Sequence, residues 1–225
     1  MKLQNLQLPI GHNHSQSVIH NRLWFVPKKE NENDSFLFPG WNHTSLFPNS
    51  NKLHIEYCSG NGSWIIDRAK AHPGVNWVAI EQRFDRARKI WTKLHNCGLQ
   101  NLLVAWAEGY TLTKMHIPDS SVDEVSINFP DPWPKRRHAK YRIIQPLFIE
   151  EMHRILVPKG MITIVTDDES YSNSIIRTML NHHGFTSGFQ DPYFCEPSSE
   201  YGSSFFDQLF RGQGKIIRLH QFIKS

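Results

Sequence analysis

The pattern that most constrains the fold begins at residue 52, where short apolar runs start to alternate with amphipathic segments. The apolar runs predict five strands, at residues 53–57, 75–80, 102–106, 122–129 and 161–166. The segments between and after them predict helices at residues 63–71, 83–96, 110–116, 141–156 and 170–183. Buried strands that alternate with helices are typical of an α/β fold, in which a mainly parallel sheet carries helices on both faces.

The two ends of the chain depart from this alternation. Extended runs at 184–189 and 215–222 follow one another with no helical pattern between them, which predicts an antiparallel pair at the sheet edge. Residues 1–50 are rich in Asn, His, Pro and aromatic residues and lack periodicity. We therefore expect an irregular N-terminal extension over 1–50, with short extended pieces near 23–26 and 36–38, followed by the main domain over 51–225.

Composition excludes several classes of protein. The chain is 39% apolar and 20% charged, and it lacks both a run of about 18 apolar residues and a signal-like N-terminus, so we expect a cytoplasmic protein without membrane contact. Cys58, Cys97 and Cys195 are too scattered for a disulfide framework. The 13 histidines show no paired metal-ligand spacing, and we expect no metal.

Acidic and small residues follow three of the predicted strands. Glu56 precedes a turn with Gly60 and Gly62, Glu81 ends the second strand, and Glu108 follows the third. Ligands of open α/β sheets bind beyond these strand ends, and a glutamate about 20 residues after a Gly-rich turn commonly binds a ribose diol. That arrangement suits NAD and S-adenosylmethionine equally. A carboxylate at Glu56 repels a pyrophosphate and attracts ammonium and sulfonium groups, which favours S-adenosylmethionine.

A proline-rich loop follows the fourth strand, with the sequence Asn128-Phe-Pro-Asp-Pro-Trp-Pro-Lys135. Three prolines in five residues fix φ and remove backbone donors, so the loop is predicted to present Asp131 and Trp133 rigidly. Five cations and no acid come next: Lys135, Arg136, Arg137, Lys140 and Arg142. Such a run alone is typical of a solvated helix start, and the net charge of +4 is too small to identify a partner. Beside a carboxylate and an indole, it favours nucleotide recognition.

This loop resembles the signature of the bacterial tRNA (guanine-N7-)-methyltransferase family, N/F-F-P-D-P-W-x-K, and the likeness covers residues 52 to 220. Further shared features are the Glu56 loop, Glu81, Ile117-Pro-Asp119, Pro158-Lys-Gly160, Thr166-Asp167, and Ser204-Phe-Phe206-Asp207 with Gly214 following. The resemblance implies a Rossmann-like class I methyltransferase fold, with a mostly parallel seven-stranded sheet and an antiparallel C-terminal edge. It also makes residues 51–225 the methyltransferase domain.

The resemblance further implies a function and a set of site residues. The implied reaction is transfer of a methyl group from S-adenosylmethionine to N7 of a tRNA guanine, by family expectation at position 46 of the variable loop. The implied S-adenosylmethionine contacts are Glu56, Glu81, Glu108 and Asp131. Gly60 and Gly62 are expected to contribute because small residues let the backbone approach a ligand. The implied tRNA contacts are Asp131, Lys135, Asp167, Ser204, Phe206 and Asp207. Because of their charge, Arg136 or Arg137 is expected to hold phosphates together with Lys135.

The sequence departs from the family pattern in four places. Cys58 replaces the first loop glycine, and Glu108 replaces an Asp or Asn. Ser204 and Asp207 are shorter or less branched than the family's Thr and Glu. Residues 1–50 do not match the basic N-terminal segment common in the family. We expect these changes to affect the affinity for the cofactor and for tRNA more than the methyl-transfer reaction itself.

Guanine N7 has an in-plane lone pair and no proton, so the reaction needs no general base. Catalysis is then mainly positioning, and Asp131 is expected to orient the guanine and to stabilise the positive charge that methylation creates. Three alternatives stay open: an exocyclic-amine methyltransferase, a tRNA-binding subunit without catalysis, and an NAD oxidoreductase. The sequence leaves both a monomer and a homodimer possible.

Overall fold

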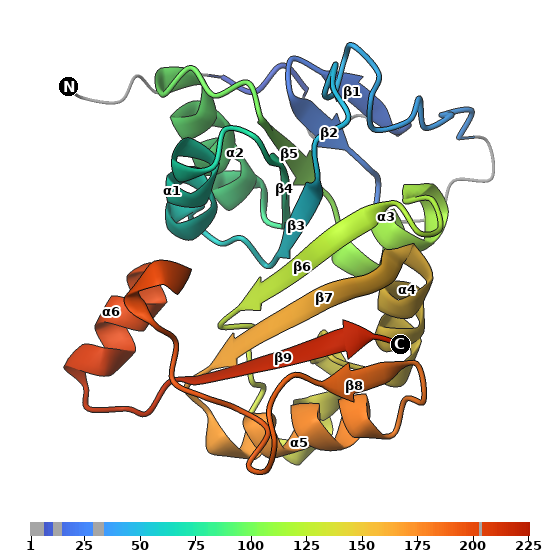
Figure 1. Cartoon of the computed structure of the whole chain (residues 1–225). Helices are drawn as coiled ribbons and strands as arrows, with labels where there is room; N and C mark the ends of the chain where they lie inside the picture. The colour runs from blue at the N-terminus through green and yellow to red at the C-terminus, as the bar shows by residue number, and fades with distance from the viewer. Residues whose placement is uncertain (1–6, 11–14, 29–33, 203) are drawn as a thin grey trace. The chain divides into compact units, whose positions relative to one another are not determined.

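The computed structural model describes residues 7–10, 15–28, 34–202 and 204–225. The chain divides into two compact units, Met1–Ile117 and Pro118–Ser225, and each is described by itself. Both units combine strands with helices that pack on them (Figure 1).

The described residues of the first unit form five strands in the order β1-β2-β5-β4-β3. Their bounds are β1 (Val18–His20), β2 (Leu23–Phe25), β3 (Leu53–Tyr57), β4 (Asn76–Glu81) and β5 (Leu102–Trp106). The pairs β2–β5, β5–β4 and β4–β3 are parallel, and β1 pairs with β2 in the antiparallel sense. Three helices belong to this unit: α1 (Ser63–Ala71), α2 (Phe84–Asn96) and α3 (Gly109–His116).

Side chains of β3 point alternately to the two faces of this sheet, and a helix packs on each face. The ring of His54 lies 5.9 Å from the ring of Trp64 in α1. The Tyr57 hydroxyl is 2.6 Å from the hydroxyl of Thr113 in α3. Successive side chains of a strand point to opposite faces, and these two strand positions differ by an odd number. Helices α1 and α3 therefore cover opposite faces of β3.

The second unit contains four strands in the order β6-β7-β9-β8. Their bounds are β6 (Val122–Asn128), β7 (Leu156–Thr166), β8 (Phe185–Ser187) and β9 (Arg218–Lys224). Strands β6 and β7 are parallel, whereas β9 pairs antiparallel with both β7 and β8. The helices are α4 (Pro146–Ile155), α5 (Glu169–Leu180) and α6 (Phe205–Gly212), with 3-10 turns η1 (Arg136–Tyr141) and η2 (Ser199–Tyr201).

The predicted fold class is confirmed, but the described residues form nine strands rather than the predicted seven, and the extra strands include β1 and β2 of the N-terminal segment. In the first unit, parallel strands are joined through helices. In the second unit, β8 and β9 form the antiparallel C-terminal pair. The strands at 53–57 and 102–106 fall on the predicted residues, because each apolar run is fully buried and is bounded by polar or turn residues. Strands β1 and β2 lie within residues 1–50, and β2 overlaps the extended piece expected near 23–26. The division of the chain at residue 50 stays a prediction.

The helix predicted over 141–156 is wrong at its N-terminal end. Helix α4 begins at Pro146, its first residue, and Gln145 before it has an extended backbone with ψ of 155°. A proline inside a helix removes a hydrogen bond and clashes with the preceding turn, and the residue before a proline disfavours helical geometry. Residues 136–141 form the separate turn η1. The regular apolar spacing therefore runs from an irregular segment, which contains Ile144, into α4.

Two further predictions near the C-terminus need correction. The turn expected at Pro158-Lys-Gly160 lies within β7, which starts at Leu156. A Cβ on Gly160 would lie 2.8 Å from the Val157 carbonyl oxygen, so this irregular stretch of strand needs glycine. Helix α6, which was not expected, separates β8 from β9 and stands away from the sheet of its unit (Figure 1). It has only eight residues, and its apolar residues Phe205 and Leu209 are exposed rather than buried against the sheet.

Within the described residues, no helix is long and apolar enough to cross a membrane. The same part of the chain holds no group of three or more His, Cys, Asp or Glu side chains suited to a metal ion.

His220 makes the stability of the second unit sensitive to pH. It is fully buried, its Nδ1 lies 3.0 Å from the Tyr193 carbonyl oxygen, and its Nε2 lies 3.1 Å from the Ser172 hydroxyl. Burial lowers the pKa of His220 from 6.5 to about 4. As the pH falls, His220 is protonated in the unfolded chain before it is protonated in the folded protein. Protonation therefore favours unfolding, and stability is lost between pH 6.5 and 4.

We expect this one group to remove up to about 3 kcal/mol of unfolding free energy over that pH range. Urea unfolding at pH 7, 5.5 and 4.5 measures the loss. In His220→Gln the pH slope should be shallower, whatever the variant's absolute stability. An equal slope in both proteins would show that His220 does not carry the effect.

Candidate functional site

The Gly-rich turn between β3 and α1 has an unusual backbone. Cys58, Gly60 and Gly62 all have positive φ, at 58°, 58° and 72°. A Cβ on Gly62 would lie 2.7 Å from Cγ1 of Ile90 in α2. Gly62 is therefore required by packing as well as by its backbone conformation, a reason that the sequence pattern did not reveal. Cys58 adopts the left-handed conformation despite its side chain.

Two side chains hold this turn in place. Glu81 accepts a hydrogen bond from the Gly60 backbone N–H at Oε2 and from the Arg83 backbone N–H at Oε1, each at 2.9 Å. Lys93 of α2 donates from Nζ to the Asn61 carbonyl oxygen at 2.8 Å. The acidic end of β4 thus orders the backbone that follows β3. Burial raises the pKa of Glu81.

The three acids at the strand ends all raise the pKa of one thiol, that of Cys58. Cys58 as a residue is exposed to solvent. The protein around the thiol nevertheless displaces water from it and raises the pKa of Cys58 to about 12. Glu81, Glu56 and Glu108 contribute to the same rise, in that order. The structure therefore brings together these three predicted cofactor residues, which come from the ends of β3, β4 and β5. The Cys58 thiol stays protonated at neutral pH and is a poor nucleophile.

This charge distribution fits S-adenosylmethionine. Three carboxylates around one loop produce a negative potential, which favours the ammonium and sulfonium charges of S-adenosylmethionine and opposes the pyrophosphate of a dinucleotide. Gly60 leaves room, because a Cβ there would have no neighbour nearer than the Cys58 carbonyl oxygen at 3.8 Å. The acid set and the open backbone at Gly60 therefore match the predicted cofactor.

Glu108 has a second task in its own unit. Its carboxylate caps α3 and accepts from the backbone N–H groups of Tyr110 and Thr111 at 3.0 and 2.7 Å. It also accepts from the Thr111 hydroxyl at 2.7 Å. Capping satisfies donors that the first helical turn leaves unpaired. The predicted contact of Glu108 with the cofactor stays a prediction, and the residue's capping role was not evident from the sequence.

In the second unit, the proline-rich loop is ordered by its own residues. Phe129 and Trp133 have positive φ, at 49° and 41°. The Trp133 backbone N–H donates to Oδ1 of Asp131 at 3.0 Å, and Asp131 is exposed. Arg142 donates from Nε to the Pro132 carbonyl oxygen at 2.8 Å. The predicted rigid presentation of Asp131 therefore depends on two hydrogen bonds in addition to the prolines.

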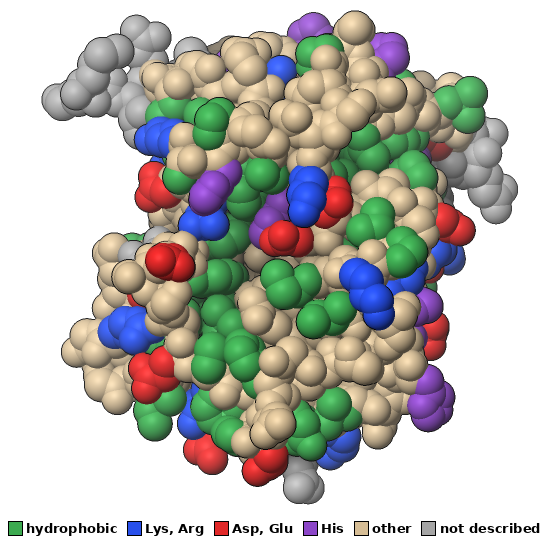
Figure 2. All heavy atoms as spheres, in the orientation of Figure 1, with side chains coloured by type: hydrophobic (Ala, Val, Ile, Leu, Met, Phe, Trp, Pro, Cys, Tyr) green, Lys and Arg blue, Asp and Glu red, His purple; other side chains and the backbone are tan. Residues whose placement is uncertain are grey.

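An aromatic cluster joins this loop to α6. The ring of Phe129 lies 6.4 Å from Phe206 and 5.6 Å from Phe210, and the latter two rings stack at 5.8 Å. Figure 2 shows hydrophobic side chains gathered at the ends of β6 and β7 beside α6. The predicted residues Asp131 and Phe206 thus belong to adjoining segments. Sequence reasoning missed Phe210, whose spacing of four from Phe206 on a helix was a usable signal.

The remaining acidic residues predicted in this unit are paired. Asp167 forms an ion pair with Lys215, whose Nζ also lies 4.2 Å from the Phe210 ring centroid. Asp207 is buried and binds Arg211 at 3.1 Å. The Ser204 hydroxyl accepts from the Asp207 backbone N–H at 3.1 Å and caps α6. Lys215 and Arg211 were not predicted, because their roles depend on pairings that only the fold creates.

Asn128 and Tyr201 fix the end of β6. The Tyr201 hydroxyl donates to Oδ1 of Asn128 at 2.7 Å, across 73 positions of sequence. The Phe129 backbone N–H donates to the Val165 carbonyl oxygen at 2.8 Å. The start of the proline-rich loop is therefore anchored both to β7 and to η2. Tyr201 carried no sequence signal.

The cations of residues 135–142 differ in their surroundings. Lys135, Arg137 and Lys140 are exposed, whereas Arg142 lies with its guanidinium 4.9 Å from the Tyr171 ring centroid and binds the loop backbone. The side chain of Arg136 lies outside the described residues. At least three cations of residues 135–142 therefore face solvent, whereas Arg142 stabilises the proline-rich loop through its hydrogen bond to Pro132.

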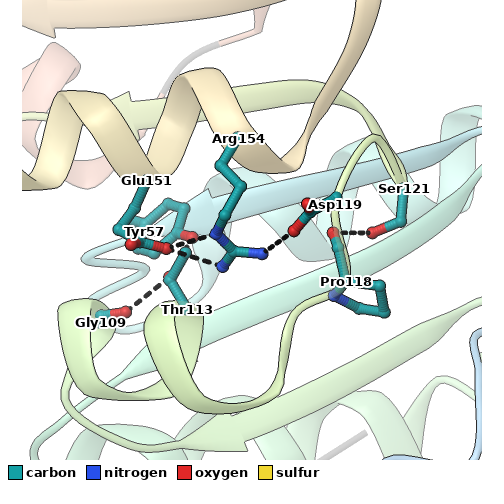
Figure 3. A network of polar contacts seen from close by, with 8 residues as sticks. All are labelled: Tyr57, Gly109, Thr113, Pro118, Asp119, Ser121, Glu151 and Arg154. Atoms are coloured by element: carbon teal, nitrogen blue, oxygen red, sulfur yellow. Dashed lines mark hydrogen bonds and ion pairs between the residues drawn. The ribbon is translucent and has the colours of Figure 1, made fainter.

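A separate polar network orders the segment before β6. Figure 3 shows Arg154 of α4, which binds Asp119 at 2.6 Å and Glu151 at 2.7 Å. The Ser121 hydroxyl donates to the Pro118 carbonyl oxygen at 2.7 Å. The Pro118-Asp119 turn, which the sequence shares with the family pattern, therefore fixes the start of the second unit's sheet to α4.

The fold is that of class I S-adenosylmethionine-dependent methyltransferases, and the acidic strand ends suit this cofactor. Solved structures agree with this fold: the 16S rRNA methyltransferase KamB superposes with a TM-score of 0.58 at 15% identity, covering 79% of this chain and 90% of its own. A SAM-dependent methyltransferase from Aquifex aeolicus gives a TM-score of 0.55 at 14% identity, over 79% of this chain and 85% of its own.

Sequence comparison identifies the family. Residues 50–217 match the family model described as putative methyltransferase. A tRNA (guanine-N(7)-)-methyltransferase of Chlamydia muridarum (strain MoPn / Nigg) is 40% identical, over 100% of this chain and 98% of its own length. The protein of that name from Lactiplantibacillus plantarum is 33% identical, over 78% and 82%. The chain belongs to the tRNA (guanine-N7-)-methyltransferase family, and the predicted resemblance is confirmed.

Proposed function

We propose that this protein transfers a methyl group from S-adenosylmethionine to N7 of a guanine in tRNA, at position 46 of the variable loop. The observation that carries the proposal is the similarity along the whole chain to proteins named for this reaction. The exposed Asp131 in its braced loop supports it, because the reaction needs an oriented carboxylate and no general base.

Glu56, Glu81 and the Gly60 backbone hold the cofactor in this proposal. S-adenosylmethionine supplies a methyl group on a positively charged sulfur. The Glu81 carboxylate, already oriented by two backbone N–H groups, accepts hydrogen bonds from the ribose hydroxyls. Glu56 is buried at the end of β3 and provides negative charge for the ammonium group. Gly62 and Glu108 support the site by shaping the loop and the start of α3.

Asp131 is the catalytic residue that we propose. Its Oδ1 accepts from the Trp133 backbone N–H, which sets the orientation of the carboxylate. The carboxylate accepts hydrogen bonds from the N–H groups of the guanine edge and so presents N7 for attack. Positive charge grows on the purine as N7 is methylated, and the fixed negative charge of Asp131 stabilises it.

The cations and the α6 region bind the rest of the tRNA. Lys135, Arg136 and Arg137 contact phosphates and contribute a salt-dependent part of the affinity. Ser204, Phe206 and Asp207 hold the nucleotide from the side of α6, and Asp167 does so from the end of β7. The pairs Asp167–Lys215 and Asp207–Arg211 set the charge of this region, since each acid is balanced by a cation.

Incorporation of labelled methyl groups tests the proposed function. The protein is incubated with labelled S-adenosylmethionine and either unmodified tRNA or a ribosomal RNA fragment of similar length. We expect label in the tRNA and background in the fragment. Preferential labelling of the fragment would contradict the substrate class, and tRNA binding without any labelling would indicate a subunit that has lost catalysis.

A further inference from the structure

Two half-buried rings, one exposed ring and exposed cations lie beside the proline-rich loop, and the proposed contacts do not account for the rings. The ring of Trp133 lies 5.3 Å from that of Tyr141 and 5.6 Å from that of His138, and the last two are 6.0 Å apart. Tyr141 is 58% exposed, one of the most exposed large apolar residues described. We call Trp133, His138 and Tyr141 the aromatic platform.

The platform is held in shape before any ligand binds. The hydrogen bond from Arg142 to the Pro132 carbonyl oxygen joins the two ends of the segment, and Trp133 and Tyr141 each lie next to one end. Arg142 is fixed in turn over the buried ring of Tyr171 in α5. Gln145 donates from Nε2 to the Ala139 carbonyl oxygen at 2.9 Å. A preorganised surface loses little conformational entropy on binding.

A cation lies over the exposed ring. Lys140 Nζ is 5.3 Å from the Tyr141 ring centroid, in a cation–π contact. At an exposed site, a cation–π contact favours the paired over the separated state of the cation and ring only about two- to fivefold. A nucleobase stacked on an aromatic ring contributes about five- to 150-fold. A base can therefore take the place of Lys140 on the ring, which releases the ammonium group to a neighbouring phosphate.

We propose that the aromatic platform binds one unpaired nucleobase of the tRNA by stacking on Tyr141, while Lys140 moves to the phosphate of that nucleotide. This inference rests on the proposed function and adds a base-binding subsite to it. No acid occurs between Lys135 and Arg142, and Lys135 and Arg137 are exposed, so the charge around the platform suits an RNA backbone. Stacking with single-stranded bases tolerates any base, so the platform selects an unpaired position rather than a sequence.

Equilibrium binding of unmodified tRNA at several salt concentrations tests the platform in four variants. Tyr141→Ala should weaken binding at least about fivefold and leave unchanged the slope of log affinity against log salt. Tyr141→Phe keeps the ring and should bind like the unaltered protein. Lys140→Met should lower the magnitude of the slope by about 0.7 to 0.9. The matched control is Leu147→Ala, because Leu147 is 68% exposed on α4 of the same unit; it should change neither quantity.

The outcomes separate this inference from the proposed function. Unaltered affinity in Tyr141→Ala, or equal weakening in Tyr141→Phe, contradicts the platform while the unaltered protein still methylates tRNA. An unchanged slope in Lys140→Met contradicts the transfer of Lys140 to a phosphate. Failure of the unaltered protein to bind or methylate tRNA contradicts the proposed function itself. Binding of S-adenosylmethionine should be the same in all four variants.

Discussion

Replacing Asp131 by Asn is expected to lower kcat for tRNA methylation by about 100- to 1000-fold, with little change in tRNA affinity. The amide oxygen of Asn can still accept from the Trp133 backbone N–H, so the loop should keep its shape. What is lost is the negative charge opposite the purine, whose positive charge develops mainly in the transition state. Interactions that strengthen in the transition state act on kcat rather than on binding.

Single-turnover methylation with saturating S-adenosylmethionine, together with tRNA binding, measures the two quantities for Asp131→Asn. The matched control is Glu150→Gln, which removes a carboxylate that is exposed on α4 of the same unit and pairs with His182. It should retain full turnover, because exposed ion pairs contribute little. Near-normal turnover in Asp131→Asn would show that the carboxylate does not stabilise the transition state.

Replacing Glu81 by Gln should weaken S-adenosylmethionine binding by about 10- to 100-fold, since hydrogen bonds to a charged group contribute roughly 1.5–3 kcal/mol. Both carboxylate oxygens accept backbone N–H groups, from Gly60 and Arg83. In Gln one of these positions becomes an NH2 group that faces another donor. The variant therefore loses a loop contact in addition to the negative charge that attracts the cofactor.

Isothermal titration with S-adenosylmethionine measures the affinity of Glu81→Gln. Asp85→Asn serves as the control, because Asp85 is an exposed acid that pairs with Arg83 at 3.2 Å close to Glu81. We expect its affinity for the cofactor to stay within about twofold of the unaltered protein. A Glu81→Gln variant that binds as tightly as this control would remove Glu81 from the cofactor site.

The parallel strands were predictable because their apolar runs are short, fully buried and bounded by turns. Strand β5 shows this directly, with five buried residues between Asn101 and Ala107. The acids at Glu56, Glu81 and Glu108 were predictable for a related reason: the carboxyl ends of neighbouring parallel strands lie at one edge of a sheet. The order β5-β4-β3 places these acids at neighbouring strand ends, and all three raise the pKa of Cys58.

What the sequence could not provide depends on contacts between distant segments. Tyr201 reaches Asn128 across 73 positions, and Lys215 reaches Asp167 across 48. Gly62 gives the appearance of a ligand-binding glycine, yet its missing side chain makes room for Ile90. The break at Pro146 was visible in principle, but the apolar spacing on either side continued through it. Helix α6 was missed because its apolar residues face an aromatic cluster and solvent rather than a sheet.

Aniline cleavage of the product tRNA locates the methylated guanine. Unmodified tRNA is incubated with the protein and S-adenosylmethionine, then reduced and treated with aniline, which cleaves the chain at 7-methylguanosine. We expect a single cleavage at guanine 46, dependent on S-adenosylmethionine and nearly absent with Asp131→Asn. Methyl label in the tRNA without aniline cleavage, or no label at all, would contradict it.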